Sequence, residues 1–155
     1  MMAKKRTPSI RTGPSSNDAH EIVYFKRHPM DDPTETKPAR DFLRNVCPGT
    51  VRVKMQAVLA AVAAAPPKRF AGGGRWEAMH GIMTGWFEVR CDGPGRHHYR
   101  LFCLLDYDAH GVDKPLLVVV DGRDKPFRTE LKDSDYAAVR ALGGEYRLRN
   151  PRSFA

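Results

Sequence analysis

The chain has 155 residues, 41% of them hydrophobic, so it can bury the core of one domain and is not disordered throughout. Its 26 lysines and arginines exceed its 18 aspartates and glutamates, which gives a formal charge of +8 at pH 7. This excess favours a polyanionic partner (a nucleic acid, an acidic protein or an anionic membrane surface), although it could also serve only solubility. No apolar run approaches the roughly 20 residues of a membrane span, and the first residues lack the apolar stretch of a signal peptide.

Three cysteines, Cys47, Cys91 and Cys103, are an odd number in a chain of this size. Two of them lie inside apolar runs, where a free thiol behaves as a small hydrophobic side chain. We expect all three to be reduced, which predicts a cytoplasmic protein.

The first ordered element is expected after a basic arm. Residues 1–20 are rich in Pro, Gly, Ser and basic side chains and have almost nothing to bury, so they predict a flexible arm. The run Glu21–Lys26 (EIVYFK) is β-branched and aromatic and predicts a strand. A polar loop with three prolines follows, from His28 to Pro38.

Two helices are predicted next, over Ala39–Cys47 and over Val51–Ala65, the second capped by Thr50. The second helix carries one apolar stripe, formed by Val51, Met55, Val58, Leu59 and Val62. A stripe of this spacing is typical of core packing, so both helices are expected to be scaffold.

Three strands are predicted in the second half, over Trp86–Cys91, His97–Tyr107 and Pro115–Arg123. The last of them contains the apolar run LLVVV, which indicates burial on both faces. The segment from Trp76 to Met83 is too short to assign. A final helix is expected over Ser134–Leu142, ended by two glycines.

The order of these elements predicts an α+β domain over residues 21–145, followed by a basic tail over residues 146–155. The sheet is expected to be mostly antiparallel with about four strands. The two N-terminal helices should pack on one of its faces, and a short helix should follow at the C-terminal end.

The hairpin between the first two of these strands predicts a polar face. If Cys91 lies opposite His97 across a five-residue turn, Glu88 lies opposite Arg100 and Arg90 opposite His98. The other face is apolar and consists of Phe87, Val89, Tyr99, Leu101 and Cys103. A slip in register would change these pairs but not the alternation within each strand.

This combination of side chains is suited to phosphate chemistry. Arginines bind phosphate in a bidentate manner and stabilise charge on a phosphorane. A histidine such as His98 can act as general base or acid on a 2′-hydroxyl, and Glu88 can orient it or neutralise Arg100. Arg123 and Lys125, at the end of the buried strand, could join the same site. The alternative is a cross-strand ladder of salt bridges with no chemical role.

No metal or other cofactor is expected. Histidines and cysteines are present, but none has the spacing of a known metal-binding motif. The adjacent His97 and His98 point to opposite faces of a strand, which disfavours joint ligation.

Three segments resemble the RelE/HigB toxin superfamily. GWFEVR (85–90) is similar to the family pattern G-x-x-E-[LV]-R, and HYRLFCLLD (98–106) is similar to Y-R-[LV]-x-Y. VVVDGRDKPFRTE (118–130) resembles the family's apolar strand with trailing basic residues. The likeness covers residues 21–142 in the order of elements.

The resemblance implies a RelE-like fold and the toxin of a type II toxin–antitoxin system. Such toxins cleave messenger RNA, usually on the ribosome, without a metal. The 2′-hydroxyl attacks the adjacent phosphate and commonly leaves a 2′,3′-cyclic phosphate. The implied partners are messenger RNA, the ribosome and a cognate antitoxin that is acidic where it makes contact. No membrane partner is implied.

The resemblance also places site residues. Arg90, Arg100 and Arg123 match basic positions of the family, whereas Trp86 and Glu88 stand where some members carry lysines. The general base would therefore be His98, His80, Tyr136 or Tyr146. With Glu88, these arginines and His98 form the predicted catalytic set, and the predicted substrate-binding residues are Lys125, Arg128, His80 and Tyr146.

The missing lysines also favour a protein without catalysis. It could be a ParE-like toxin that binds gyrase, or a basic RNA-binding module. A structural or accessory protein with a salt-bridged sheet face is the third reading. The retained Arg90, Arg100 and Arg123 oppose the non-catalytic binder.

Overall fold

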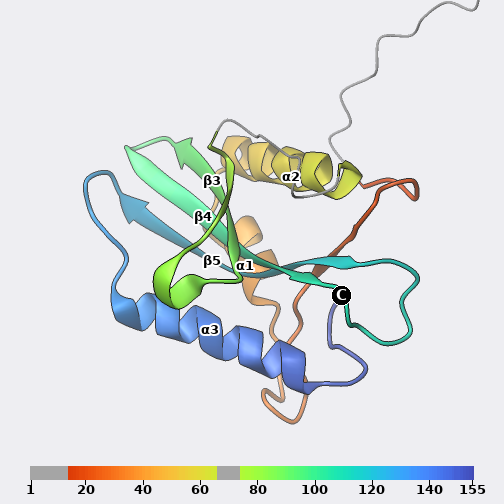
Figure 1. Ribbon diagram of the computed structural model, residues 1–155. Coiled ribbons are helices and arrows are strands. Elements are labelled where there is room, and N and C mark those ends of the chain that lie inside the picture. The colour runs from red at the N-terminus through yellow and green to blue at the C-terminus, as the bar shows by residue number, and fades with distance from the viewer. Residues whose placement is uncertain (1–13, 66–73) are drawn as a thin grey trace, which may run out of the picture.

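A computed structural model describes residues 14–65 and 74–155 and shows an α+β domain (Figure 1). The elements in chain order are β1 Glu21–Tyr24, α1 Pro38–Asn45, α2 Gly49–Ala64, β2 Trp76–Ala78, the 3-10 turn η2 Gly81–Met83, β3 Phe87–Gly93, β4 His97–Asp106, β5 Leu116–Pro126 and α3 Asp133–Leu148. The strands lie in the order β1-β5-β4-β3-β2. Strand β1 is parallel to β5, and the other neighbouring pairs are antiparallel.

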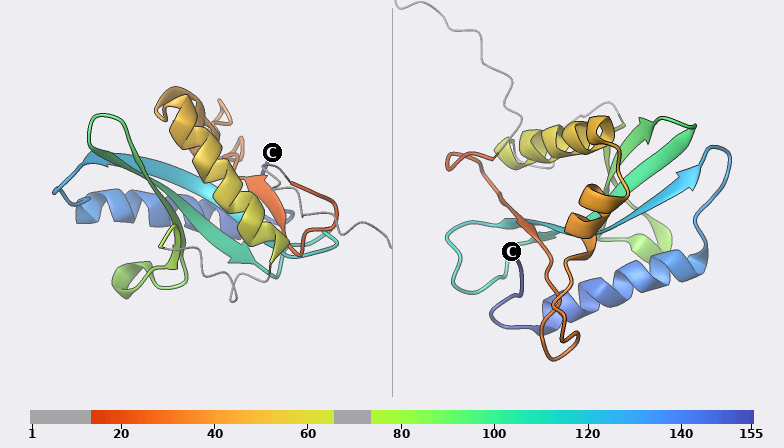
Figure 2. Two further views of the ribbon diagram at one scale, coloured as in Figure 1. Left: turned by 90° about the horizontal axis from the view of Figure 1, so that it is seen from above. Right: turned by 180° about the vertical axis from the view of Figure 1, so that it is seen from behind.

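The predicted α+β class is confirmed, but the sheet differs from the expected one. It has five strands rather than about four, because the short β2 adds an edge strand beside β3. It is also mixed, because β1 pairs in parallel with β5. Helices α1 and α2 cover one face of the sheet, as expected, and α3 covers the other (Figure 2).

Each face of the sheet has its own apolar core, and β5 contributes to both. Residues Leu116–Val120 of β5 are completely buried, which confirms the prediction from the LLVVV run. Leu117 and Val119 pack with α1 and α2, whereas Val118 and Val120 pack with Val139 of α3. The sheet is therefore the middle layer of three.

Helix α3 is longer than predicted, because the two glycines that were expected to end it lie inside it. An ideal Cβ on Gly143 would lie 2.4 Å from Cζ2 of Trp86, so the indole occupies the space that a side chain would need. Gly143 therefore allows close packing of α3 on the sheet rather than a helix end. Of the expected tail, residues 146–148 belong to α3, and Phe154 forms an isolated bridge with Phe25, just after β1.

Two further expectations concern the first half of the chain. Thr50 does not cap α2, because the N-cap is Pro48, whose carbonyl accepts the N–H of Arg52. Residues 1–13 of the expected arm lie outside the described residues. His20, at its end, is buried. Within residues 14–65 and 74–155, no helix is both long and apolar enough to cross a membrane.

Candidate functional site

The hairpin of β3 and β4 has a tighter turn than expected. Gly93 pairs with His97, so the turn contains only three residues, of which Gly95 and Arg96 have positive φ values of 73° and 56°. Arg90 therefore lies opposite Arg100 instead of His98, a shift of two residues from the expected register. A shift of two leaves every side chain on its expected face.

A β-bulge then brings β5 into the same polar face. Phe102 of β4 pairs with Asp121, but the next residue, Cys103, pairs with Val119, so Val120 has no partner in β4. The extra residue reverses the alternation of β5 beyond this point. As a result Arg123 lies directly opposite Arg100, on the face that α3 partly covers.

Arg90, Arg100 and Arg123 thus form a row across three neighbouring strands, here called the arginine row. Neighbouring strands are about 4.8 Å apart, so like charges in such a row repel unless carboxylates lie among them. Two buried carboxylates do so: Glu88 beside Arg100 and Asp121 beside Arg123.

The ion pairs of the arginine row are short. Nη1 of Arg100 donates to both carboxylate oxygens of Glu88, at 3.2 and 3.1 Å, and Nε of Arg90 lies 3.6 Å from Glu88 Oε1. Nη1 of Arg123 donates to Oδ2 of Asp121 at 2.7 Å. Burial raises the pKa of Asp121, and the charge of Arg123 acts against this rise. These carboxylates fix the guanidinium groups and reduce their repulsion.

A histidine–aspartate pair occupies the next row. Nδ1 of His98 donates to Asp92, which leaves Nε2 free to accept a proton. The ring of Phe127 stacks on His98 at a centroid distance of 4.4 Å and restricts its orientation. Lys125 lies directly opposite His98 on β5. Burial, followed by the charge of Arg100, lowers the pKa of Lys125.

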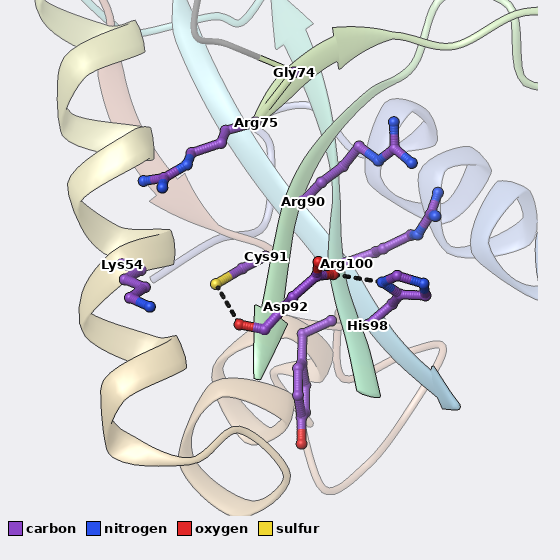
Figure 3. Close-up of a pocket in the computed structure, with 9 residues that line it drawn as sticks. Lys54, Gly74, Arg75, Arg90, Cys91, Asp92, His98 and Arg100 are labelled. Carbon is purple, nitrogen blue, oxygen red and sulfur yellow. Dashed lines mark hydrogen bonds and ion pairs between the residues drawn. The ribbon is translucent and has the colours of Figure 1, made fainter. Parts of the chain in front are cut away.

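A cavity of about 360 Å³ connects Arg90, Arg100 and the His98–Asp92 pair with the edge of β3, whereas Arg123 and Lys125 do not line it. Its charged and titratable lining consists of Lys54, Arg75, Arg90, Cys91, Asp92, His98, Tyr99 and Arg100. Figure 3 shows Lys54, Arg75 and Cys91 on one side of β3 and Arg90, Arg100 and His98 on the other. The cavity therefore spans both sides of one strand.

The remaining residues of the predicted site lie elsewhere. His80 is exposed at the start of η2 and Arg128 is exposed beyond β5, and neither lines the cavity. Tyr146 is completely buried and donates a hydrogen bond to Asp106 at 2.7 Å, so it cannot bind a substrate as expected. Tyr136 lies nearer to the arginine row: burial raises its pKa, and the charge of Arg100 opposes this effect.

Sequence reasoning missed three charged residues of the cavity. Asp92 was placed in the turn, although it lies within β3 opposite His98. Lys54 lies on a helix that was interpreted as scaffold, and Arg75 directly precedes β2. No motif in the sequence marks the two cations; only the close approach of α2 to β3 brings them together.

Among the described residues, no three His, Cys, Asp or Glu side chains lie close enough to one another to hold a metal ion. A comparison with known proteins found no matching family model, no matching curated protein and no matching solved structure.

Proposed function

We propose that this chain is a metal-independent endoribonuclease of the RelE/HigB type, with a RelE-like fold, acting as the toxin of a type II toxin–antitoxin system. The observation that supports it best is the arginine row beside the His98–Asp92 pair. The row offers several cationic donors to one phosphate, and the pair offers an oriented base one row away.

In this proposal the arginine row binds the phosphodiester and stabilises the charge of the pentacoordinate phosphorane. Nε2 of His98 accepts the proton of the 2′-hydroxyl, whose oxygen forms a bond to phosphorus. The bond from phosphorus to the 5′ oxygen breaks, which leaves a 2′,3′-cyclic phosphate. Lys125, with its lowered pKa, donates a proton to the departing 5′ oxygen.

The proposed setting is the cytoplasm, where messenger RNA on the ribosome is the substrate. A cognate antitoxin with an acidic contact segment would neutralise the basic groups around the cavity. Cleavage of messenger RNA would inhibit translation.

One observation favours a second candidate, a basic module that binds RNA or another polyanion without cleaving it. Each arginine of the row already has a carboxylate partner, so part of its charge is neutralised before any ligand binds. A non-catalytic binder and a nuclease would share the same binding face. Only the fate of the RNA distinguishes them.

The test compares two neighbouring histidines. His98→Ala should lower the rate of RNA cleavage by about 100-fold to 10,000-fold, the usual contribution of a general base. His97→Ala is the matched control, because His97 points to the opposite face of β4 and should leave the rate unchanged. Cleavage is measured on purified RNA and in a translation extract, by quantifying 2′,3′-cyclic phosphate ends.

Arg90→Ala is a second variant of the proposed site and should also lower the rate, while Glu88 keeps its closer partner Arg100. We prefer it to Arg100→Ala and Arg123→Ala, which would leave the buried Glu88 or Asp121 without its closest partner and risk unfolding the domain. RNA that stays intact with wild-type protein in both assays refutes the nuclease. If such RNA is still bound tightly, the non-catalytic binder is the better description.

A further inference from the structure

The edge of β3 is only partly covered by its neighbour. Strand β2 pairs with residues Phe87–Val89, and the N–H of Arg90 donates to the carbonyl of Arg75. On the edge of β3 that faces away from β4, no strand of the described part of the chain pairs with the remaining residues, Cys91–Gly93. The cavity described above opens at this uncovered edge.

Two cations on the α2 side of this edge have charges that are not neutralised. Within residues 14–65 and 74–155, the side chains of Lys54 and Arg75 form no ion pair and no hydrogen bond. Both lie close to the half-buried Cys91: burial raises the pKa of this thiol, and the two cations oppose that rise. In the arginine row, by contrast, Arg90 and Arg100 share Glu88. The strongest uncompensated positive charge of the cavity is therefore on the far side of β3 from the row.

We propose that single-stranded RNA crosses the edge of β3 at this cavity, with one phosphate on Arg90 and Arg100 and a neighbouring phosphate on Lys54 and Arg75. This inference rests on the proposed function and deepens it, because it defines the substrate as unpaired RNA. It also assigns a binding role to two residues outside the proposed catalytic set.

The size and shape of the cavity favour an unpaired strand. A volume of about 360 Å³ is near the lower end of the range for small-molecule sites, roughly 300–1,000 Å³, and suits one nucleotide rather than a helix. Passing from one side of a strand to the other requires a sharp bend of the backbone. Unpaired RNA can make such a bend, whereas a base-paired helix is recognised along its grooves over many base pairs.

The test measures binding without cleavage. The probe is a short fluorescent oligoribonucleotide that carries 2′-methoxy groups in place of its 2′-hydroxyls, so His98 has no proton to remove. Its affinity is measured by anisotropy over a series of salt concentrations for the wild type, for Lys54→Gln/Arg75→Gln, and for Lys37→Gln/Arg44→Gln. The last pair removes the same charge from exposed positions that do not line the cavity.

Each phosphate contact on a single strand contributes about 0.7 to the slope of log affinity against log salt. Lys54 and Arg75 hold one phosphate in this proposal, so replacing both should reduce the slope by about 0.7. This is a loss of about 5-fold in the affinity gained when salt is lowered tenfold. The control pair should retain the wild-type slope. An unchanged slope in Lys54→Gln/Arg75→Gln, an equal fall in the control, or a duplex that binds as tightly as the single strand overturns the proposal.

Cys91 provides an independent readout, because it is the half-buried thiol of the cavity while Cys47 and Cys103 are buried. The oligonucleotide should protect Cys91 from iodoacetamide. Equal alkylation with and without it, or protection by a polyglutamate peptide but not by RNA, overturns the proposal. Because the probe cannot be cleaved, a negative binding result overturns this inference without affecting the cleavage assay. A negative cleavage assay, in turn, counts against the nuclease but does not change the binding result.

Discussion

Two adjacent glycines of α3 should differ in their response to the same substitution. At Gly143 an added Cβ would lie 2.4 Å from Cζ2 and 2.7 Å from Cη2 of Trp86. Overpacking of this kind costs about 1–3 kcal/mol. Replacing a helical glycine by alanine gains about 1 kcal/mol of helix propensity. Gly143→Ala should therefore lower the free energy of unfolding, measured in urea, by about 0–2 kcal/mol.

Gly144→Ala is the matched control, because an added Cβ there meets nothing within 4 Å. It keeps the gain in helix propensity without the steric cost, so it should stabilise the domain. The difference between the two variants isolates the packing cost of about 1–3 kcal/mol. For a chain of this length that difference corresponds to about 2–12 °C in Tm. Equal stability of the two variants would show that Trp86 can move away, and would refute the close packing as the reason for Gly143.

Two further predictions concern buried titratable groups. Burial raises the pKa of Asp106, but hydrogen bonds from Tyr146, the backbone of Asp108 and Arg152, with the charge of Arg152, together lower it by more. This carboxylate therefore stabilises the fold above its unfolded pKa, and the stabilisation is lost as pH falls through its folded pKa. Tyr146→Phe should cost about 1–3 kcal/mol at neutral pH and less in acid; equal urea midpoints at neutral pH would contradict this. Burial, and then Lys114, lower the pKa of His20 from 6.5, so wild-type stability should be full above that value and fall below it. His20→Phe should flatten this dependence in urea titrations over the same range, and a variant as sensitive to pH as the wild type would count against it.

Local patterns in the sequence were sufficient for the elements and for the polar face of the hairpin. The alternation of Arg90 and His98 with apolar neighbours specifies a face whatever the register, because a side chain's face depends only on the period of two. The register itself depends on the turn. The pair Gly95-Arg96 adopts positive φ values in a three-residue turn, and nothing in the composition of the segment from Asp92 to Arg96 distinguishes this turn from a longer one.

Contacts between distant segments were beyond the sequence. The role of Gly143 depends on Trp86, which lies nearly sixty residues earlier in the chain. From its local sequence alone, Gly143 therefore predicts a helix end. Tyr146 was predicted to belong to a basic tail, because its hydrogen-bond partner Asp106 lies far away in the sequence, at the end of β4. Lys54 and Arg75 belong to the cavity only because α2 packs across β3. Each of these features is a tertiary contact with no local signature.

The bulge in β5 has a consequence for how the arginine row can change. Gly122 and Arg123 both pair with β4 but face opposite sides of the sheet. The unpaired Val120 determines which of the two residues faces which side. Side-chain substitutions alone cannot move Arg123 out of the row or Gly122 into it. Only an insertion or deletion in β5 can exchange the two positions. The side chain of Arg123 would then clash with the ring of Phe42, which lies 2.1 Å from an ideal Cβ on Gly122. Chain length in β5, rather than composition, is thus the variable that holds the arginine row together.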